Sequence, residues 1–253
     1  MFTKALVRTP CRSILKGLTQ ANLGLPNFDI ACEQHQDYIN ALQECGLQVT
    51  ELPALEDYPA SCFVEDVALL TPQCAILTSP GAESRRGEVQ HIEEAIKLFY
   101  PKIERINSNG HVEAGDIMMV DNHFCIGLSE RTDPKGAAEL IAILGKYNLT
   151  GSMVEMSELL HLKTGLSYLE DNNLLTFGEM HSHPDFKSFN RIQIDKEEDY
   201  AANSVWINGT VLVPKGFPKA LNAIKQLGYK TREVAMSEFQ KLDGGLSCLS
   251  LRF

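Results

Sequence analysis

Long apolar segments are missing from this chain of 253 residues. No run reaches the about 18 consecutive apolar residues from which a membrane-spanning helix is recognised. Residues 1–13 also lack the apolar core of a secretory signal. We therefore expect neither a membrane partner nor secretion, and we predict a cytoplasmic protein.

Basic residues are in the minority, with 23 Lys and Arg against 33 Asp and Glu and a net charge of −10. This balance argues against nucleic acid or an anionic membrane as the main partner, because both attract basic surfaces. The same negative field would attract a small cationic substrate.

Paired cysteine motifs are also missing. The seven cysteines are odd in number and scattered, and none forms a CxxC pair, so the sequence does not indicate a disulfide framework. A reducing cytoplasm is consistent with this pattern, and it would keep Cys248 available as a free thiol.

An apolar strand, a tight turn, a second apolar strand and a helix recur along the chain. The turns near residues 72, 122 and 172 lie about 50 residues apart, which is the spacing of repeat or propeller-like architectures. A fourth turn at Asn208-Gly209 has strong hairpin chemistry. The alternative is a generic α+β protein with evenly spaced hairpins. The helices expected from this pattern cover residues 29–44, 87–99, 134–147 and 218–227.

No low-complexity tract or Pro/Gly linker divides the chain, so we expect a single domain over residues 1–253. A circular arrangement of its units would bring the first residues of several units to a common centre. The residues at those positions that carry chemistry are Glu65, Asp66, Glu113, His161 and Cys248.

Carboxylates occur inside two of the apolar runs expected to be strands. Glu65 and Asp66 lie in the run 62–70, and Glu113 lies in the run 112–120. Buried carboxylates need a cationic partner, and a guanidinium matches their planar geometry. The alternatives are structural: one of the first pair faces outward while the other pairs with a nearby arginine, and Glu113 is an edge-strand residue.

Cys248 lies in a glycine-rich segment, where Gly244 and Gly245 allow close backbone approach. His161 begins the third unit, and histidine serves as acid or base near neutral pH. A cysteine and a histidine far apart in sequence are the usual layout of a thiol enzyme. A structural role for this lone histidine is the alternative.

Two further segments have candidate roles, and a third does not. Gly17–Gly24, with Leu18 exposed, is a candidate lid or a surface connection. Arg85, just before a helix, is a candidate partner for a carboxylate. His181-Ser-His183 lacks further ligands at convincing spacing, so we expect no metal site.

Seven segments of the chain together resemble the dimethylarginine dimethylaminohydrolases, which belong to the guanidino-group-modifying enzymes. The resemblance runs over essentially the whole chain, in the family's order. The segments are FVEDVALL, SPGAESRRGE, VEAGDIMMV, FCIGLSERT, HLKTGLSYLE, YAAN and DGGLSCLSLRF. It implies an α/β-propeller (pentein) of five ββαβ-type units around a pseudo-fivefold axis, a possible homodimer, and no metal or organic cofactor.

The resemblance also implies residue roles. Cys248 is the nucleophile, His161 the general acid and base, and Glu113 orients that histidine. The implied substrate-binding residues are Asp66 and Glu65 at the guanidinium, Arg85 and Arg131 at the carboxylate, and Leu18 and Leu242 at the amino end.

The implied reaction is hydrolysis of dimethylarginine to citrulline and dimethylamine through a covalent thiouronium on Cys248. Deiminases of unmethylated arginine usually have His-x-Asp where this chain has His161-Leu-Lys163. A dimethylated nitrogen has no N–H to donate, so Lys163 favours a methylated substrate. Near residue 60 the family commonly has an aspartate that helps to bind the amino end of the substrate. This chain has Ala60 instead. A deiminase of another guanidine and a non-catalytic propeller that binds ligands are the alternatives.

Overall fold

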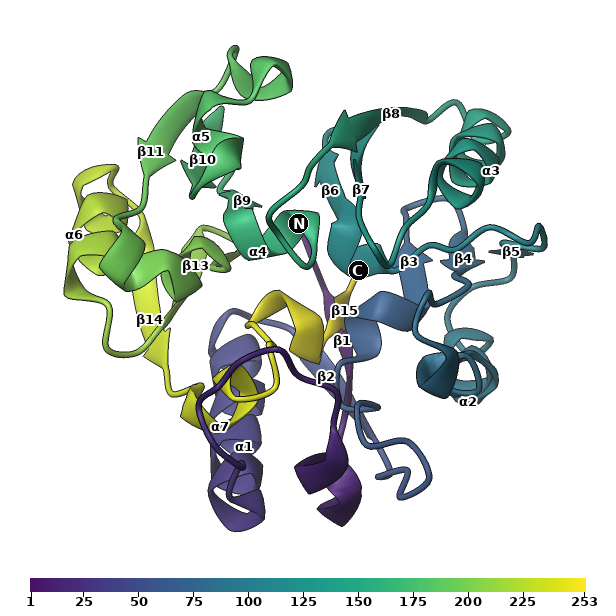
Figure 1. The fold of residues 1–253 in the computed structure, drawn as a ribbon, viewed down its shortest axis with the longest axis horizontal. Coiled ribbons are helices and arrows are strands. Elements are labelled where there is room, and N and C mark those ends of the chain that lie inside the picture. The colour runs from purple at the N-terminus through teal and green to yellow at the C-terminus, as the bar shows by residue number, and fades with distance from the viewer.

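The computed structural model describes all 253 residues, and its strands form five separate sheets of three strands (Figure 1). In every sheet the middle strand is antiparallel to one neighbour and parallel to the other. With the middle strand second, the sheets are β15 (Leu251–Arg252), β1 (Lys4–Arg8) and β2 (Gln48–Leu52); β3 (Ala68–Leu70), β4 (Ala75–Leu77) and β5 (Ile103–Arg105); β6 (Ile117–Val120), β7 (His123–Leu128) and β8 (Thr150–Glu155); β9 (Leu166–Tyr168), β10 (Asn173–Thr176) and β11 (Asn190–Gln193); and β12 (Val205–Ile207), β13 (Thr210–Pro214) and β14 (Lys230–Val234).

Four of the five antiparallel pairs are joined by the turns that the sequence predicts, and the fifth pairs β1 with β15 from the other end of the chain. At Asn208-Gly209, both residues have positive φ, of 50° and 90°, as a two-residue hairpin turn requires. Asp171 and Asn172 adopt the same conformation between β9 and β10. Because Asn, Asp and Gly tolerate this region of φ, local turn chemistry sets the register of these hairpins.

A helix connects the middle strand to its parallel neighbour in four of the sheets. These helices are α1 (Phe28–Glu44), α2 (Glu88–Ile96), α3 (Pro134–Gly145) and α6 (Pro218–Gln226), close to the ranges predicted from the sequence. The fourth sheet has only the one-turn helix α5 (Glu179–Ser182) and the 3-10 turn η5 (Pro184–Phe186) in this connection. The prediction of an α/β class is thus confirmed.

The beginning of each unit differs from the prediction. A helical turn, and not a strand, precedes the first strand of every sheet. These turns are η2 (Val64–Val67), η4 (Ala114–Asp116), α4 (Leu162–Gly165), η6 (Lys196–Ala202) and η7 (Ser247–Leu249). A strand would point Glu65 and Asp66 to opposite faces, whereas the turn buries both, at 4% and 3% exposure.

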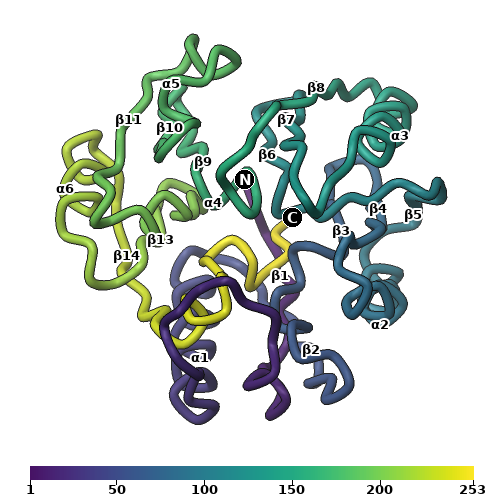
Figure 2. The backbone as a smooth tube through the Cα atoms, in the orientation of Figure 1, coloured from purple at the N-terminus to yellow at the C-terminus, as the bar shows by residue number.

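The five sheets surround the region where the two labelled chain ends lie (Figures 1 and 2). There β1 pairs with β15, with Ala5 opposite Arg252 and Leu6 opposite Leu251. Apolar side chains form five buried clusters, and the largest contains 21 residues, among them residues of β1, α1 and β13. None of the helices has both the length and the apolar character needed to cross a bilayer.

Candidate active site

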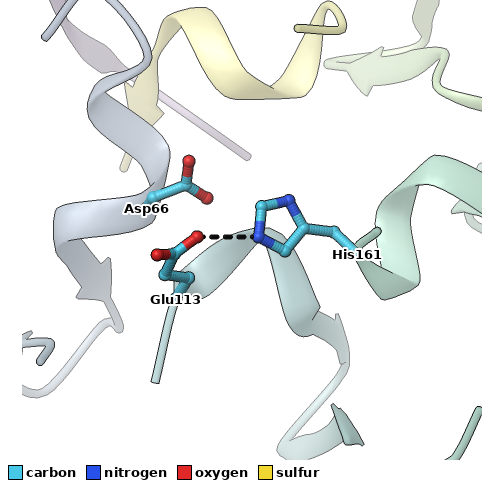
Figure 3. A group of neighbouring side chains, drawn as sticks. All are labelled: Asp66, Glu113 and His161. Atoms are coloured by element: carbon cyan, nitrogen blue, oxygen red, sulfur yellow. Dashed lines mark hydrogen bonds and ion pairs between the residues drawn. The ribbon is translucent and has the colours of Figure 1, made fainter. Parts of the chain in front are cut away.

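The helical turns that precede the strands bring the predicted site residues together. Asp66 lies in η2, Glu113 immediately precedes η4, His161 immediately precedes α4, and Cys248 lies in η7. Polar atoms of Asp66, Glu113 and His161 all lie within 4.8 Å of one another, and their side chains point toward a common space (Figure 3). Cys248 and His161 line the same pocket. Residues up to 182 positions apart are therefore neighbours, as the hydrogen bond between Ser247 and Glu65 illustrates.

His161 is held by Glu113. The distance from His161 Nε2 to Glu113 Oε2 is 2.9 Å, and Glu113 is fully buried (Figure 3). Burial by itself would lower the pKa of His161, but the carboxylates of Asp116, Asp66 and Glu113 outweigh it and raise the pKa to about 9. At neutral pH the imidazole is therefore protonated and able to donate a proton.

Gly115 separates Asp66 from His161. A Cβ atom at this position would lie 2.7 Å from Asp66 Oδ1 and 2.8 Å from His161 Nδ1. The Gly115 backbone N–H donates to Asp66 Oδ1 at 3.0 Å. A glycine is thus needed here for close approach of two functional side chains.

Arg85 has internal partners in this structure, and its predicted contact with a substrate carboxylate stays a prediction. Its guanidinium is 5% exposed, makes a short ion pair with Asp66 and binds Glu88 at 2.8 Å. It also donates to the carbonyl oxygens of Ala60 and Phe63. Burial would raise the pKa of Asp66, but His161 and Arg85 together hold it below its usual value. In this structure Arg85 therefore acts on Asp66 from inside the protein.

Cys248 is partly buried, and its side chain lines the pocket. Its Sγ accepts a hydrogen bond from the Gly245 N–H at 3.3 Å, and its side chain packs against the largest apolar cluster. Burial, followed by the charges of Glu65 and Asp66, raises the pKa of the Cys248 thiol to about 12. Without a bound cation, the thiol is therefore protonated at neutral pH.

Glu65 and Lys163 both line the thiol pocket. Lys163 Nζ lies 2.6 Å from Glu65 Oε1, and the hydroxyl of Ser247 donates to Glu65 Oε2 at 2.8 Å. Arg252 lies 3.4 Å from the same carboxylate. Lys163 is thus fixed by an internal ion pair with a residue of another unit.

Two residues that support the cysteine segment were missed by the sequence reasoning. Asn203 Oδ1 accepts from the Ser247 N–H at 2.9 Å, and the Tyr200 hydroxyl donates to the Gly244 carbonyl oxygen at 2.6 Å. Both belong to the segment YAAN, which entered the resemblance without a role. Neither side chain is charged. Only the presence of YAAN among the segments that resemble the family pointed to these two residues.

The thiol pocket is narrow, with a volume of about 40 Å³, and a cavity of about 210 Å³ adjoins it. Thr164, Tyr200 and Asp243 line both. Of the candidate lid, Ala21 and Leu23 line the cavity, whereas Leu18 is 52% exposed and lines neither space.

Leu242 and Arg131 also lie near the site. Leu242 is 6% exposed and faces Gly17, where a Cβ atom would lie 3.2 Å from its side chain. Arg131 Nη1 lies 3.6 Å from Glu113 Oε1, and the Arg131 side chain retains 20% exposure. Arg131 is therefore less enclosed than Arg85.

Asp66, Glu113 and His161 have the spacing of a possible three-ligand cation site. Their polar groups already bind one another or Arg85. The same arrangement is therefore explained by a network of internal ion pairs without a metal ion. His181 and His183 bind Thr176 Oγ1 and the Glu155 carbonyl oxygen, each at 2.9 Å. Independence from metals remains a prediction.

The fold and the site together define an α/β protein of five three-stranded sheets with a cysteine, a histidine and a carboxylate at their meeting point. Residues 25–166 match the family model described as "N,N dimethylarginine dimethylhydrolase, eukaryotic". The chain is 55% identical to the N(G),N(G)-dimethylarginine dimethylaminohydrolase of Pseudomonas aeruginosa, over 100% of both chains. It is 30% identical to the Streptomyces coelicolor protein of the same name, over 98% of this chain and 96% of that protein. The chain belongs to the dimethylarginine dimethylaminohydrolase family.

Solved structures agree with this assignment. A cysteine-to-serine mutant of the Pseudomonas aeruginosa protein, complexed with citrulline, matches with a TM-score of 0.99 and 54% identity over 100% of both chains. A histidine-to-glycine mutant of a dimethylarginine dimethylaminohydrolase, as an adduct with S-methyl-L-thiocitrulline, matches equally well. The N-terminal domain of ArgZ, a cyanobacterial arginine dihydrolase, shares the fold with a TM-score of 0.87 at 17% identity, over 100% of this chain and 97% of that chain.

Proposed function

We propose that this protein hydrolyses dimethylarginine to citrulline and dimethylamine through a covalent intermediate on Cys248. The observation that carries the proposal is one pocket that presents the Cys248 thiol and a histidine charged by a buried carboxylate. Relatives with 54% identity bind citrulline and S-methyl-L-thiocitrulline at TM-scores of 0.99, which supports the same substrate class here.

Substrate binding activates the nucleophile. Glu65 and Asp66 raise the pKa of the Cys248 thiol in the empty pocket. A guanidinium that binds between these carboxylates and the sulfur opposes their effect, so the thiol releases its proton to solvent when the substrate is in place. The thiolate then forms a bond to the guanidinium carbon, which Asp66 holds in position.

His161 supplies the proton for the departing amine. The imidazolium, stabilised by Glu113, protonates the dimethylamino nitrogen as the C–N bond breaks, which leaves a thiouronium on Cys248 and a neutral His161. A water then attacks the same carbon and the C–S bond breaks. One proton of the water returns to His161 and the other to the sulfur, so the enzyme is restored.

The remaining residues bind or position the substrate. Arg131 is the proposed partner of the substrate carboxylate, because its side chain keeps exposed surface. Arg85 is a positioning residue for Asp66. Leu242 and Leu18 are proposed contacts of the amino end, and Leu18 would have to move inward from its exposed position.

The ion pair between Lys163 and Glu65 favours a methylated substrate over arginine. It places an ammonium group in the lining of the thiol pocket, where a deiminase of arginine would need an additional carboxylate. A dimethylated nitrogen requires no such acceptor.

We also infer the architecture, location and assembly of the protein. The five sheets support an α/β-propeller of five ββαβ-type units that forms one catalytic domain over residues 1–253. A cytoplasmic location, a homodimer, and independence from metal and organic cofactors complete the proposal. Dialysis against a chelator should leave turnover unchanged, and light scattering measures the oligomeric state.

The test is a substrate panel of dimethylarginine, monomethylarginine and arginine, with citrulline and the released amine both measured. We expect dimethylamine release from dimethylarginine to be the fastest reaction, and Cys248→Ser to abolish it. Faster release of ammonia from arginine would identify a deiminase instead. Undiminished turnover by the serine variant would overturn the mechanism.

A further inference from the structure

Asp243 has no role in the reaction described above, although it lies beside the nucleophile. It directly precedes Gly244 and Gly245, and its φ of 59° is unusual for a residue with a side chain. Its side chain borders both the thiol pocket and the adjoining cavity of about 210 Å³. Asp243 thus stands at the boundary between the reacting centre and the space beneath the 17–24 loop.

The acidic groups of the site differ in their partners. Glu65 binds Lys163 at 2.6 Å, Asp66 binds Arg85, and Glu113 binds His161. Asp243 is the only acidic side chain lining the thiol pocket that forms no ion pair. Its single side-chain hydrogen bond is accepted from the Gln20 N–H by Oδ2 at 2.6 Å, which leaves Oδ1 free.

A guanidino amino acid has a positive charge at each end. If its guanidinium occupies the pocket at Cys248, its other end extends into the adjoining space that Asp243 borders. We propose that Asp243 binds the α-ammonium group of the substrate and selects guanidino α-amino acids over guanidino acids that lack this group. This inference rests on the proposed function for the orientation of the substrate.

The neighbouring segment supports this assignment. A Cβ atom at Gly244 would lie 2.1 Å from the ring of Phe63, so the chain at 243–244 packs directly on the segment that contains Ala60. Ala60 supplies only a methyl group and a carbonyl oxygen, and Arg85 occupies the latter. Asp243 therefore supplies negative charge on a side of the site where residue 60 has none.

The bond to Gln20 gives Asp243 a second, purely structural interpretation as an anchor for the 17–24 loop. The two roles are separable, because loop anchoring affects every substrate and ammonium binding affects only substrates that carry an ammonium. Asp243→Asn keeps an oxygen that can accept from the Gln20 N–H and removes the charge, so it tests the charge specifically.

The experiment compares dimethylarginine with its analogue that lacks the α-amino group, in the wild type and the variant. We expect Asp243→Asn to lower kcat/KM for dimethylarginine about 10- to 100-fold, mainly through KM, and to change the analogue less than about twofold. Asp243→Glu should restore part of the loss. The matched control is Asp171→Asn, because Asp171 has a similar positive φ of 50° but is exposed and lines neither space, so both substrates should be unaffected.

Equal losses of kcat/KM for both substrates would show that Asp243 only anchors the 17–24 loop, and would overturn the inference. No loss of kcat/KM for either substrate would also overturn it. Binding to the Cys248→Ser variant separates this inference from the proposed function. Calorimetry with citrulline, and with citrulline lacking its amino group, should show weakening by Asp243→Asn for citrulline alone. That result would stand even if dimethylarginine were not the substrate. If Asp243→Asn does not fold, Asp243→Ser replaces it in the same comparison.

Discussion

His161 Nε2 lies 2.9 Å from Oε2 of Glu113, a carboxylate with no exposed surface. The pair joins the third and fourth sheets, since Glu113 precedes η4 and His161 precedes α4. Because Asp66 and Asp116 add their negative charge, the imidazole is kept protonated well above the pH at which a free histidine loses its proton. In the proposed reaction, the protonated imidazole donates its proton to the leaving amine.

Replacing Glu113 by Gln should make His161 a weaker base. The substitution removes a negative charge beside the imidazolium, so the pKa of His161 should fall from about 9 by roughly one unit. NMR titration of the ring nitrogens measures this shift, and kcat should fall about 100-fold or more. Glu158→Gln is the control, because Glu158 is exposed and close in sequence. An unchanged pKa would contradict the proposed role of Glu113.

A methyl group at Gly115 should separate Asp66 from His161. The added Cβ atom would lie 2.7–2.8 Å from both side chains, so at least one must move. A displacement of about 1 Å can reduce turnover about 100-fold, and we expect a loss of that size in kcat for Gly115→Ala with the fold retained. Gly145→Ala, where no atom lies within 4 Å of the added carbon, should retain full activity. Wild-type turnover by Gly115→Ala would show that the two side chains need not meet.

Replacing Arg85 by Met should destabilise the protein and not merely weaken substrate binding. The substitution leaves the buried carboxylates of Asp66 and Glu88 without their cation, and we expect a loss of about 3–5 kcal/mol in the free energy of unfolding. Denaturant titration measures it. Arg86→Met, at an exposed neighbouring position, should change stability by no more than about 0.5 kcal/mol. A stable Arg85→Met protein with only a raised KM would instead support the contact with the substrate carboxylate that the sequence predicts.

An aspartate at position 60 should strengthen binding of the substrate's amino end. Ala60 contributes no charge, and Ala60→Asp adds a carboxylate to the segment that packs on Gly244. We expect KM for dimethylarginine to fall about two- to fivefold with kcat unchanged, as for a partly exposed ion pair. Ala60→Asn is the uncharged control. A KM that stays the same in Ala60→Asp would place the amino end away from residue 60.

The parts of the fold that local chemistry determines were predictable. The hairpin at Asn208-Gly209 follows from residues that accept positive φ, and α3 begins at a proline after Asp133, whose side chain caps it. The meeting of Glu113 with His161 was also expected, because both begin a unit of the repeat.

The inward direction of Arg85 depends on contacts that no local pattern encodes. Its partner Asp66 is 19 positions away, and an arginine before a helix is compatible with either an exposed or a buried guanidinium. The turn η2 was mistaken for a strand because its four residues contain two apolar and two acidic side chains, too few to separate the two periodicities. Nothing in the chemistry of Asn203 or its sequence neighbours indicated a role in the site.

The five helical turns determine how activity is lost when the protein unfolds. Each sheet contributes one turn or its flanking residue to the centre, so no single sheet contains a working fraction of the site. When one sheet opens under heat or denaturant, the site loses the thiol, the imidazole, a carboxylate, or the side chains of Tyr200 and Asn203 that hold the cysteine segment. Enzymatic activity therefore requires all five sheets to be folded. It should be lost when the first sheet unfolds.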